Sequence, residues 1–230
     1  MTPAGAIAPL PFLPEAVIFD MDGLMLDSER AINACMERAA HELGHALPPT
    51  LWLQMVGGNE ALCLRLLSAH IGRAPAMALL DRAEILYDAV ADAGIDHRPG
   101  IVDLLELLVA RGIPRAVATS TRRPLALRKL AAAGLLPYFG AVCTSSDVAR
   151  PKPAPDVYLL AATRLGVAPP RCLVLEDSPT GVRAALAAGM TPIQVPDLLE
   201  PDAETRALQH RIVGSLAQAQ RLLEALLPVA

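Results

Sequence analysis

Residues 17–29, which read VIFDMDGLMLDSE, constrain the fold of this chain more than any other stretch. Residues 17–19 are β-branched or aromatic with no polar break, which is typical of a strand buried on both faces of a parallel sheet. Asp20 and Asp22 end this strand, and Gly23 permits the turn that leaves the sheet, where ligands of open α/β sheets bind. Two carboxylates about 4 Å apart repel by roughly 4 kcal/mol at an effective dielectric constant of about 20, so the pair needs a cation. We therefore hypothesise a Mg²⁺ site at this strand end.

After residue 100, short apolar runs alternate with helical patterns that end at glycines. The predicted strands are 114–120, 141–144, 172–175 and 193–195. The predicted helices are 101–110, 124–133, 155–165, 180–188 and 215–227. Short connections require each crossover helix to cover a face of the sheet, so we predict an α/β fold with a Rossmann-like, doubly wound parallel sheet.

Residues 28–96 interrupt this alternation, because they carry helical patterns and no strand pattern. Helices are predicted at 28–44, with Ser28 as its N-cap, and at 51–56, 60–71 and 75–93. We therefore predict an inserted α-helical cap domain of residues 28–96 and a core domain of residues 1–27 and 97–230. The hinges of the cap are expected near residues 27–28 and 96–100, and Asp27 is expected to help set the closed geometry.

Composition narrows the class of protein further. The chain of 230 residues is 53% hydrophobic, and its apolar runs are too short to span a membrane. Its net charge of −4 gives no electrostatic reason to bind nucleic acid. The four scattered cysteines indicate reduced core thiols, and an N-terminus broken by prolines and lacking Lys or Arg predicts a loose arm rather than a signal peptide. We expect a cytoplasmic protein that is a monomer or a weak homodimer.

Four polar clusters follow the predicted strands: Asp20 and Asp22, Thr119 and Ser120, Lys152, and Glu176 and Asp177. Each cluster has a structural alternative, namely a turn, an N-cap, a solvated loop cation and a second helix cap. Parallel strands share a direction, so all four clusters would meet at one edge of the sheet. Their joint occurrence favours a catalytic site over four separate structural features.

The segments FDMDGLMLDSE, VATST, RPKPAPDVY and LVLEDSPTGVRAALAAGM resemble, in order, the four motifs of the haloacid dehalogenase superfamily. The similarity is to the branch of phosphatases and β-phosphoglucomutase-like proteins, and it extends from residue 17 to about residue 195. It implies an aspartyl-phosphate formed on the first aspartate of the opening motif. It also implies a small phosphorylated metabolite as substrate and Mg²⁺ as cofactor, with no nucleic-acid or membrane partner.

The resemblance also implies a role for each motif residue. Asp20 would be the nucleophile and Asp22 the general acid/base. The implied metal ligands are Asp20, the backbone carbonyl of Asp22, and Asp177, with Glu176 helping directly or through water. Thr119 and the Ser120 amide would donate hydrogen bonds to the phosphoryl group, and Lys152 would hold both Asp20 and the phosphate.

Other reactions of the superfamily fit less well. A dehalogenase would lack Asp22, and a phosphonate-cleaving enzyme would need a cap lysine, which residues 28–96 do not contain. Sugar-phosphate mutases typically have a histidine where this chain has Ile32 and an arginine where it has Glu60, although Arg65 could substitute. We therefore favour a phosphatase over the alternative of a β-phosphoglucomutase-like mutase. A catalytically inactive binding or regulatory module is a third, less favoured reading.

The remaining expected substrate contacts lie outside the core motifs. Gly57, Gly58 and Asn59 form a candidate cap loop that faces the substrate, with a plain helix–helix turn as the alternative. Arg122 and Arg123, just after the second motif, could face the far side of the phosphate, and we expect one of them to do so and the other to be solvated. Sugar phosphates, phosphoglycolate and nucleoside monophosphates all remain open as substrates.

Overall fold

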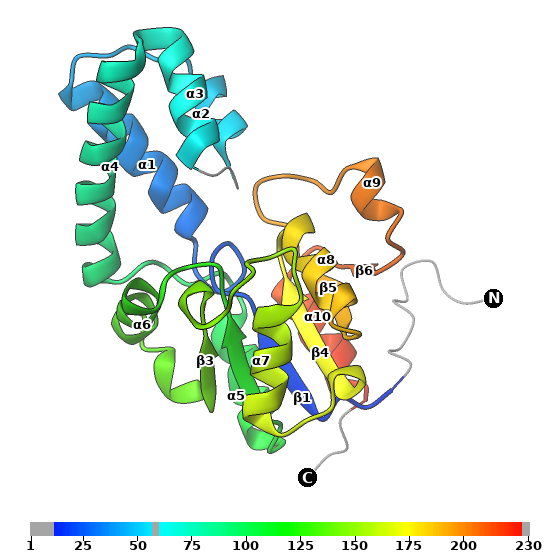
Figure 1. The fold of residues 1–230 in the computed structure, drawn as a ribbon. Coiled ribbons are helices and arrows are strands. Elements are labelled where there is room, and N and C mark those ends of the chain that lie inside the picture. The colour runs from blue at the N-terminus through cyan, green and yellow to red at the C-terminus, as the bar shows by residue number, and fades with distance from the viewer. Residues whose placement is uncertain (1–11, 57–59, 227–230) are drawn as a thin grey trace.

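A computed structural model describes residues 12–56 and 60–226 of the chain, and a parallel sheet forms its centre (Figure 1). Its six described strands lie in the order β3-β2-β1-β4-β5-β6, and every neighbouring pair is parallel. They are β1 (Ala16–Phe19), β2 (Arg115–Ala118), β3 (Ala141–Cys143), β4 (Cys172–Glu176), β5 (Thr191–Gln194) and β6 (Arg211–Ile212). This strand order confirms the predicted Rossmann-like, doubly wound sheet.

Side chains of β1 alternate between two apolar clusters, one on each face of the sheet. Val17 and Phe19 pack against α5 (Ile101–Ala110), α6 (Arg123–Ala132) and α10 (Leu216–Glu224). Ala16 and Ile18 pack against α7 (Asp156–Leu165) and α8 (Pro179–Ala187). Because both faces are covered, β1 is buried along its whole length, as its unbroken apolar sequence predicted.

Between β1 and α5 the chain forms helices that lie beyond the carboxyl ends of the strands (Figure 1). They are α1 (Ser28–Glu42), α2 (Pro49–Met55), α3 (Glu60–Ile71) and α4 (Arg73–Ala93). Their apolar faces share a cluster of their own, which includes Trp52 and Leu67. The two connections to the core lie side by side: the Asp27 amide donates to the Asp96 carbonyl at 2.8 Å, and the Arg98 amide to the Met25 carbonyl at 2.9 Å. The domain boundaries at residues 28 and 96 stay a prediction.

Two local features differ from the sequence prediction. The N-cap position of α1 is Asp27, and the hydroxyl of Ser28 instead accepts a hydrogen bond from the Gly23 amide at 3.2 Å. Ser28 is buried and faces the loop after β1, so its side chain stabilises that loop rather than the helix end. Strand β6 and helix α9 (Ala203–Arg206) were not predicted, because two and four residues are too short to show a period.

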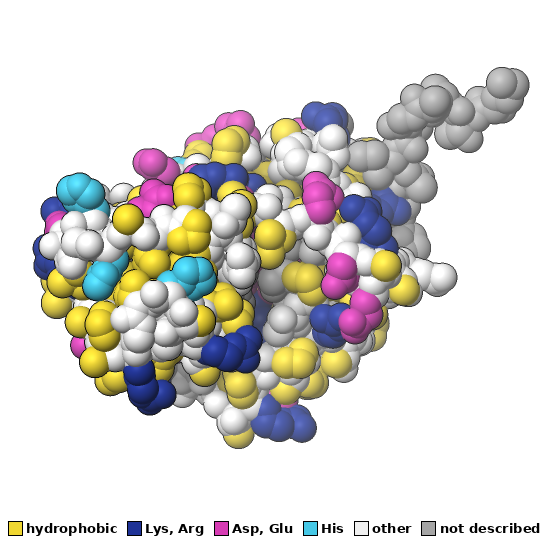
Figure 2. Space-filling model, turned by 90° about the horizontal axis from the view of Figure 1, so that it is seen from above, with side chains coloured by type: hydrophobic (Ala, Val, Ile, Leu, Met, Phe, Trp, Pro, Cys, Tyr) yellow, Lys and Arg dark blue, Asp and Glu magenta, His cyan; other side chains and the backbone are white. Residues whose placement is uncertain are grey.

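The remaining global predictions concern the cysteines, the surface and the termini. Cys35, Cys63, Cys143 and Cys172 are all buried and free, as predicted. On the face seen in Figure 2, acidic and basic side chains are interspersed with apolar ones rather than gathered by charge. Within residues 12–56 and 60–226, no helix has the length and apolar character needed to cross a membrane. The predicted N-terminal arm lies largely outside the described residues.

Candidate active site

The carboxyl ends of the central strands bring the predicted clusters together. Asp20 follows β1, Thr119 follows β2, and Glu176 ends β4, with Asp177 directly after it. The Asp20 amide donates to the Leu175 carbonyl at 3.0 Å, so the first and fourth motifs lie next to each other. Lys152 reaches the same place from the connection between β3 and α7.

Lys152 is a buried cation that joins three of these segments. Its side chain is 3% exposed, and its ammonium group donates to Asp20 Oδ1 at 2.6 Å, Glu176 Oε1 at 2.6 Å and the Ala118 carbonyl at 3.0 Å. Three acceptors use all three hydrogens of the ammonium group. Although burial lowers the pKa of Lys152, the charges of Asp20 and Glu176 raise it well above its ordinary value. The alternative of a solvated loop cation is therefore wrong.

Glu176 has partners on both carboxylate oxygens. The Tyr158 hydroxyl donates to Oε1 at 2.8 Å, and the Ser178 amide and hydroxyl both donate to Oε2 at 2.9 Å. Burial opposes ionisation, but Lys152 and these donors lower the pKa of Glu176 overall. Glu176 thus positions Lys152, and its direct contact with a metal stays a prediction. Tyr158 belongs to the third motif, RPKPAPDVY, but sequence reasoning gave it no role.

Asp20 and Asp177 are buried carboxylates whose negative charges the neighbouring cations do not fully neutralise. Burial raises the pKa of Asp20 to about 7 against the attraction of Lys152, and the charges of Glu176 and Asp22 add to the rise. Burial, together with the charges of Glu176 and Asp20, raises the pKa of Asp177 well above its usual range. A bound cation would relieve both effects.

The geometry around Gly23 fits such a cation. A Cβ atom at Gly23 would lie 2.2 Å from Asp177 Oδ2, so the absence of a side chain lets Asp177 approach the loop after β1. In the part of the chain that the structure describes, no three His, Cys, Asp or Glu side chains form a ready ligand set. Two carboxylates, one backbone carbonyl and several waters are nevertheless a donor set that Mg²⁺ accepts.

Asp22 and Asp20 bind different side chains. It forms an ion pair with Lys129 of α6 through Oδ1, and Oδ2 accepts a hydrogen bond from the Thr121 hydroxyl at 2.6 Å. Burial raises the pKa of Asp22, but the Lys129 charge and these hydrogen bonds lower it more, so the pKa lies below its usual value. Sequence reasoning missed Lys129. The available signal was its rarity, since the chain contains only two lysines.

The segment after β2 carries the predicted phosphate donors. Thr119 is buried and its Oγ1 accepts from the Thr121 amide at 3.0 Å, while Ser120 and Arg122 are exposed. The N-cap position of α6 is Arg122, with no side-chain cap, so the capping alternative for these threonines is wrong. Ser178 does cap α8, where it accepts from the Gly181 amide at 3.0 Å. The phosphate contacts of Thr119, Ser120 and Arg122 stay predictions.

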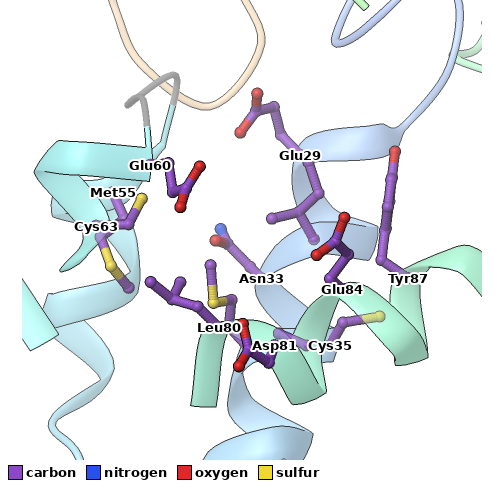
Figure 3. Close-up of a pocket in the computed structure, with 13 residues that line it drawn as sticks. Glu29, Asn33, Cys35, Met55, Glu60, Cys63, Leu80, Asp81, Glu84 and Tyr87 are labelled. Carbon is purple, nitrogen blue, oxygen red and sulfur yellow. The ribbon is translucent and has the colours of Figure 1, made fainter. Parts of the chain in front are cut away.

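A cavity of about 350 Å³ opens among the helices of residues 28–93 (Figure 3). Asn33 and Glu84 line one side of it from α1 and α4, and Met55, Glu60 and Cys63 lie opposite (Figure 3). Its lining includes four carboxylic acids and no Lys, Arg or His from the described residues. They are Glu29, Glu60, Asp81 and Glu84. The predicted loop Gly57-Gly58-Asn59 lies outside the described residues, so its contact with substrate stays untested.

The chain and its fold are similar to known proteins. A family model described as haloacid dehalogenase-like hydrolase matches residues 14–189. Hexitol phosphatase A of Escherichia coli (strain K12) is 37% identical over 200 residues, which cover 84% of this chain and 91% of that protein. Phosphorylated carbohydrates phosphatase of Thermotoga maritima is 31% identical over 218 residues, covering 92% of this chain and 91% of that one. A solved HAD family hydrolase from Deinococcus radiodurans R1, with bound phosphate and sodium, has a TM-score of 0.80 and 33% identity, covering 95% and 99% of the two chains.

Proposed function

This chain belongs to the haloacid dehalogenase-like hydrolase family, and from that premise we propose that it is a Mg²⁺-dependent phosphomonoesterase of a small phosphorylated sugar or polyol. The observation that carries the proposal is the separation of the two loop aspartates. Lys152 binds Asp20, whereas Lys129 and Thr121 bind Asp22. Two carboxylates with different partners can serve different roles, one as nucleophile and one as acid and base.

In the first step, a carboxylate oxygen of Asp20 attacks phosphorus and the bond from phosphorus to the ester oxygen breaks. Lys152 already occupies Oδ1 of Asp20, which leaves Oδ2 to attack. Asp22 donates a proton to the departing ester oxygen, so an alcohol leaves rather than an alkoxide. Lys152 offsets the negative charge that accumulates near Asp20, and Thr119 donates to a phosphoryl oxygen.

In the second step, water hydrolyses the aspartyl-phosphate. Asp22, now ionised, takes a proton from the water, and the new bond to phosphorus forms as the bond to Asp20 breaks. Inorganic phosphate leaves, and both aspartates return to their starting states. The Lys129 charge, which lowers the pKa of Asp22, favours the ionised form that this step needs and disfavours the protonated form that the first step uses.

The metal would be held by the carboxylates of Asp20 and Asp177 and by the backbone carbonyl of Asp22, with Glu176 acting through water. When bound, Mg²⁺ supplies positive charge that neutralises the phosphoryl oxygens. Gly23 and the raised pKa values of Asp20 and Asp177 support this placement.

The cavity in the cap favours a phosphatase over a mutase. A mutase must bind a second phosphate, for which an arginine fork is the usual partner. Ile32 and Glu60 line the cavity, Arg65 is exposed and does not, and no cation is among the described lining residues. Carboxylates accept hydrogen bonds from hydroxyl groups and repel a second anion, so a neutral sugar or polyol moiety suits this lining. The buried free cysteines support the further proposal of a cytoplasmic enzyme.

The test is turnover of p-nitrophenyl phosphate and of a panel of sugar phosphates, polyol phosphates, phosphoglycolate and nucleoside monophosphates. We expect hydrolysis that a chelator abolishes and that Asp20→Asn lowers by at least about 1,000-fold. Asp103→Asn makes the same substitution at an exposed position of α5 and should leave activity unchanged.

Two results would overturn the proposal. A pure Mg²⁺-loaded protein with no turnover on any ester would indicate an inactive binding module. Glucose 6-phosphate formed from β-glucose 1-phosphate and its bisphosphate activator, faster than free phosphate is released, would indicate a mutase.

A further inference from the structure

The chain contains two lysines, and both are buried in ion pairs with the loop aspartates. The steps of the proposed function explain Lys152 but give Lys129 no contact with substrate. The Lys129 side chain is 2% exposed, and it meets Asp22 across 107 residues of sequence. We propose that Lys129 is a positioning residue, which fixes the carboxylate of Asp22 for proton transfer to the leaving group. This inference rests on the proposed function.

The carboxylate of Asp22 has a separate hydrogen-bond donor on each oxygen. Lys129, in the second half of α6, binds Oδ1, and Thr121, in the turn before α6, binds Oδ2. Both of these donors come from the segment that follows β2, and the Ser28 side chain, at the start of α1, adds a further hydrogen bond to Asp22. Lys152, which binds Asp20, comes from the segment that follows β3. The two aspartates are two residues apart in sequence, yet separate parts of the fold hold them.

Stability alone does not explain a lysine at this position. Burying an ammonium group costs several kcal/mol unless it is paired, and an apolar residue in such a place is often neutral or better. The neighbouring buried positions of α6, Ala126 and Leu130, are apolar. What the ammonium group of Lys129 adds is a fixed partner for one oxygen of Asp22, and hence a fixed direction for that carboxylate.

Lys129 also lies between Asp22 and the cap. Its Nζ is 5.3 Å from the centroid of the Tyr87 ring, and Tyr87 belongs to α4 and lines the cap cavity. Arg128, the preceding residue, also connects α6 to α4, where it pairs with Asp92 at 2.7 Å and Asp88 at 3.4 Å on the surface. Of these two neighbours, Lys129 is the one that binds Asp22, so Arg128 provides a matched control.

The leaving group distinguishes positioning of Asp22 from general support of the fold. An alkyl phosphate needs a proton on its departing oxygen, whereas nitrophenolate leaves without one. The ratio kcat/KM reports the steps through formation of the aspartyl-phosphate, in which this proton is transferred. A badly held Asp22 should therefore impair glycerol 3-phosphate far more than p-nitrophenyl phosphate, since general acid catalysis contributes about 100- to 10,000-fold.

The experiment measures kcat/KM for both esters in the Mg²⁺-loaded wild type, Lys129→Met and Arg128→Met. We expect Lys129→Met to lower the ratio of the alkyl to the aryl value by about tenfold or more, and Arg128→Met to leave it within twofold. In an Asp22→Asn background, Lys129→Met should have little further effect on the alkyl ester, because both changes act on one carboxylate. Lys129→Arg should restore part of the ratio.

The inference would be overturned if Lys129→Met lowered kcat/KM equally for both esters. It would also be overturned if Lys129→Met lowered kcat/KM for the alkyl ester as much in the Asp22→Asn background as in the wild type. If Lys129→Met does not fold, as judged by circular dichroism, Lys129→Gln removes the charge while keeping a polar group of similar length. A wild type that hydrolyses no ester of the substrate panel would refute the proposed function first. Wild-type turnover with an unchanged ratio in Lys129→Met would refute the inference alone.

Discussion

At the scale of single residues, the loop after β1 depends on one glycine. Gly23 has φ of +78°, and its missing Cβ leaves the space that Asp177 occupies. The positive φ and the close approach of Asp177 would each disfavour a side chain at this position, but they affect different properties of the protein. The backbone conformation affects stability, whereas the contact with Asp177 affects the candidate metal site.

Gly23→Ala should separate these two effects when it is compared with Gly112→Ala. Gly112 has φ of +64° and no atom within 4 Å of its would-be Cβ. Both variants should lose about 1–2 kcal/mol of unfolding free energy from backbone strain. Displacement of Asp177 should lower kcat a further 100-fold or so in Gly23→Ala alone. Urea unfolding and phosphatase assays measure the two quantities, and equal kcat values would contradict the assigned contact.

Glu60 is the cap residue for which a single substitution tests specificity. Glu60 lines the cavity. Sugar-phosphate mutases that this chain resembles typically have an arginine at the same position. Glu60→Arg should lower KM for a sugar bisphosphate about tenfold, as one charge-assisted contact would. Glu37→Arg, on the exposed side of α1, changes the net charge equally and should not. An unchanged KM in both variants would place the second phosphate elsewhere.

At the scale of elements, the segment after β3 is fastened to the start of α6. Asp147 accepts from the Thr144 amide and hydroxyl, both at 2.8 Å, and from Arg123 Nε at 3.0 Å. Burial opposes ionisation, but Arg123 and Thr144 lower the pKa of Asp147 to about 2. This contact holds α6, and with it Lys129, at a set distance from the sheet.

Asp147→Asn should lower the free energy of unfolding by about 1–2 kcal/mol at pH 7. Because the folded pKa is depressed, the stabilisation is complete above the unfolded value of about 3.8 and is lost as pH falls toward 2. The difference from wild type should shrink over that range in urea titrations. Asp156→Asn, which removes a more exposed pair with Arg150, should cost less. A loss that does not change with pH would show that the Asp147 charge is not responsible.

At the scale of the whole molecule, the cap helices meet the core at two adjacent connections and a charged joint. Arg30 of α1 and Arg98 of the second connection both pair with Asp197 of the core, at 2.8 Å and 2.7 Å. Backbone hydrogen bonds join the two connections directly. We expect such a joint to let the helices of residues 28–93 rotate as one body about a short axis, close over the strand ends and exclude bulk water.

Crystals grown with and without Mg²⁺ and a phosphate mimic should therefore differ by a rigid-body rotation of the cap. Small-angle scattering should show a smaller radius of gyration with the mimic bound. An Asp20→Asn protein incubated with Mg²⁺ alone serves as the control for metal effects. Identical arrangements of cap and core in all states would contradict closure.

Much of the core site could be predicted from the sequence, because parallel strands place their carboxyl ends at one edge whatever their exact order. Asp20, Thr119, Lys152 and Asp177 could thus be grouped before their distances were known. The ion pairs within the site could not be predicted in this way. Which lysine binds which aspartate depends on how helix α6 is rotated against the sheet, and Lys129 reaches Asp22 across 107 residues.

The sequence by itself determined the fold class, the helical insertion and the order of the motifs, since these follow from local periodicity and from turn residues. Only the tertiary structure decided that Lys152, Tyr158 and Ser178 all donate hydrogen bonds to Glu176, and that the cap cavity is acidic. Both depend on side chains that distant segments direct into a shared space. No local pattern records that packing, because it arises only when the helices settle on the sheet.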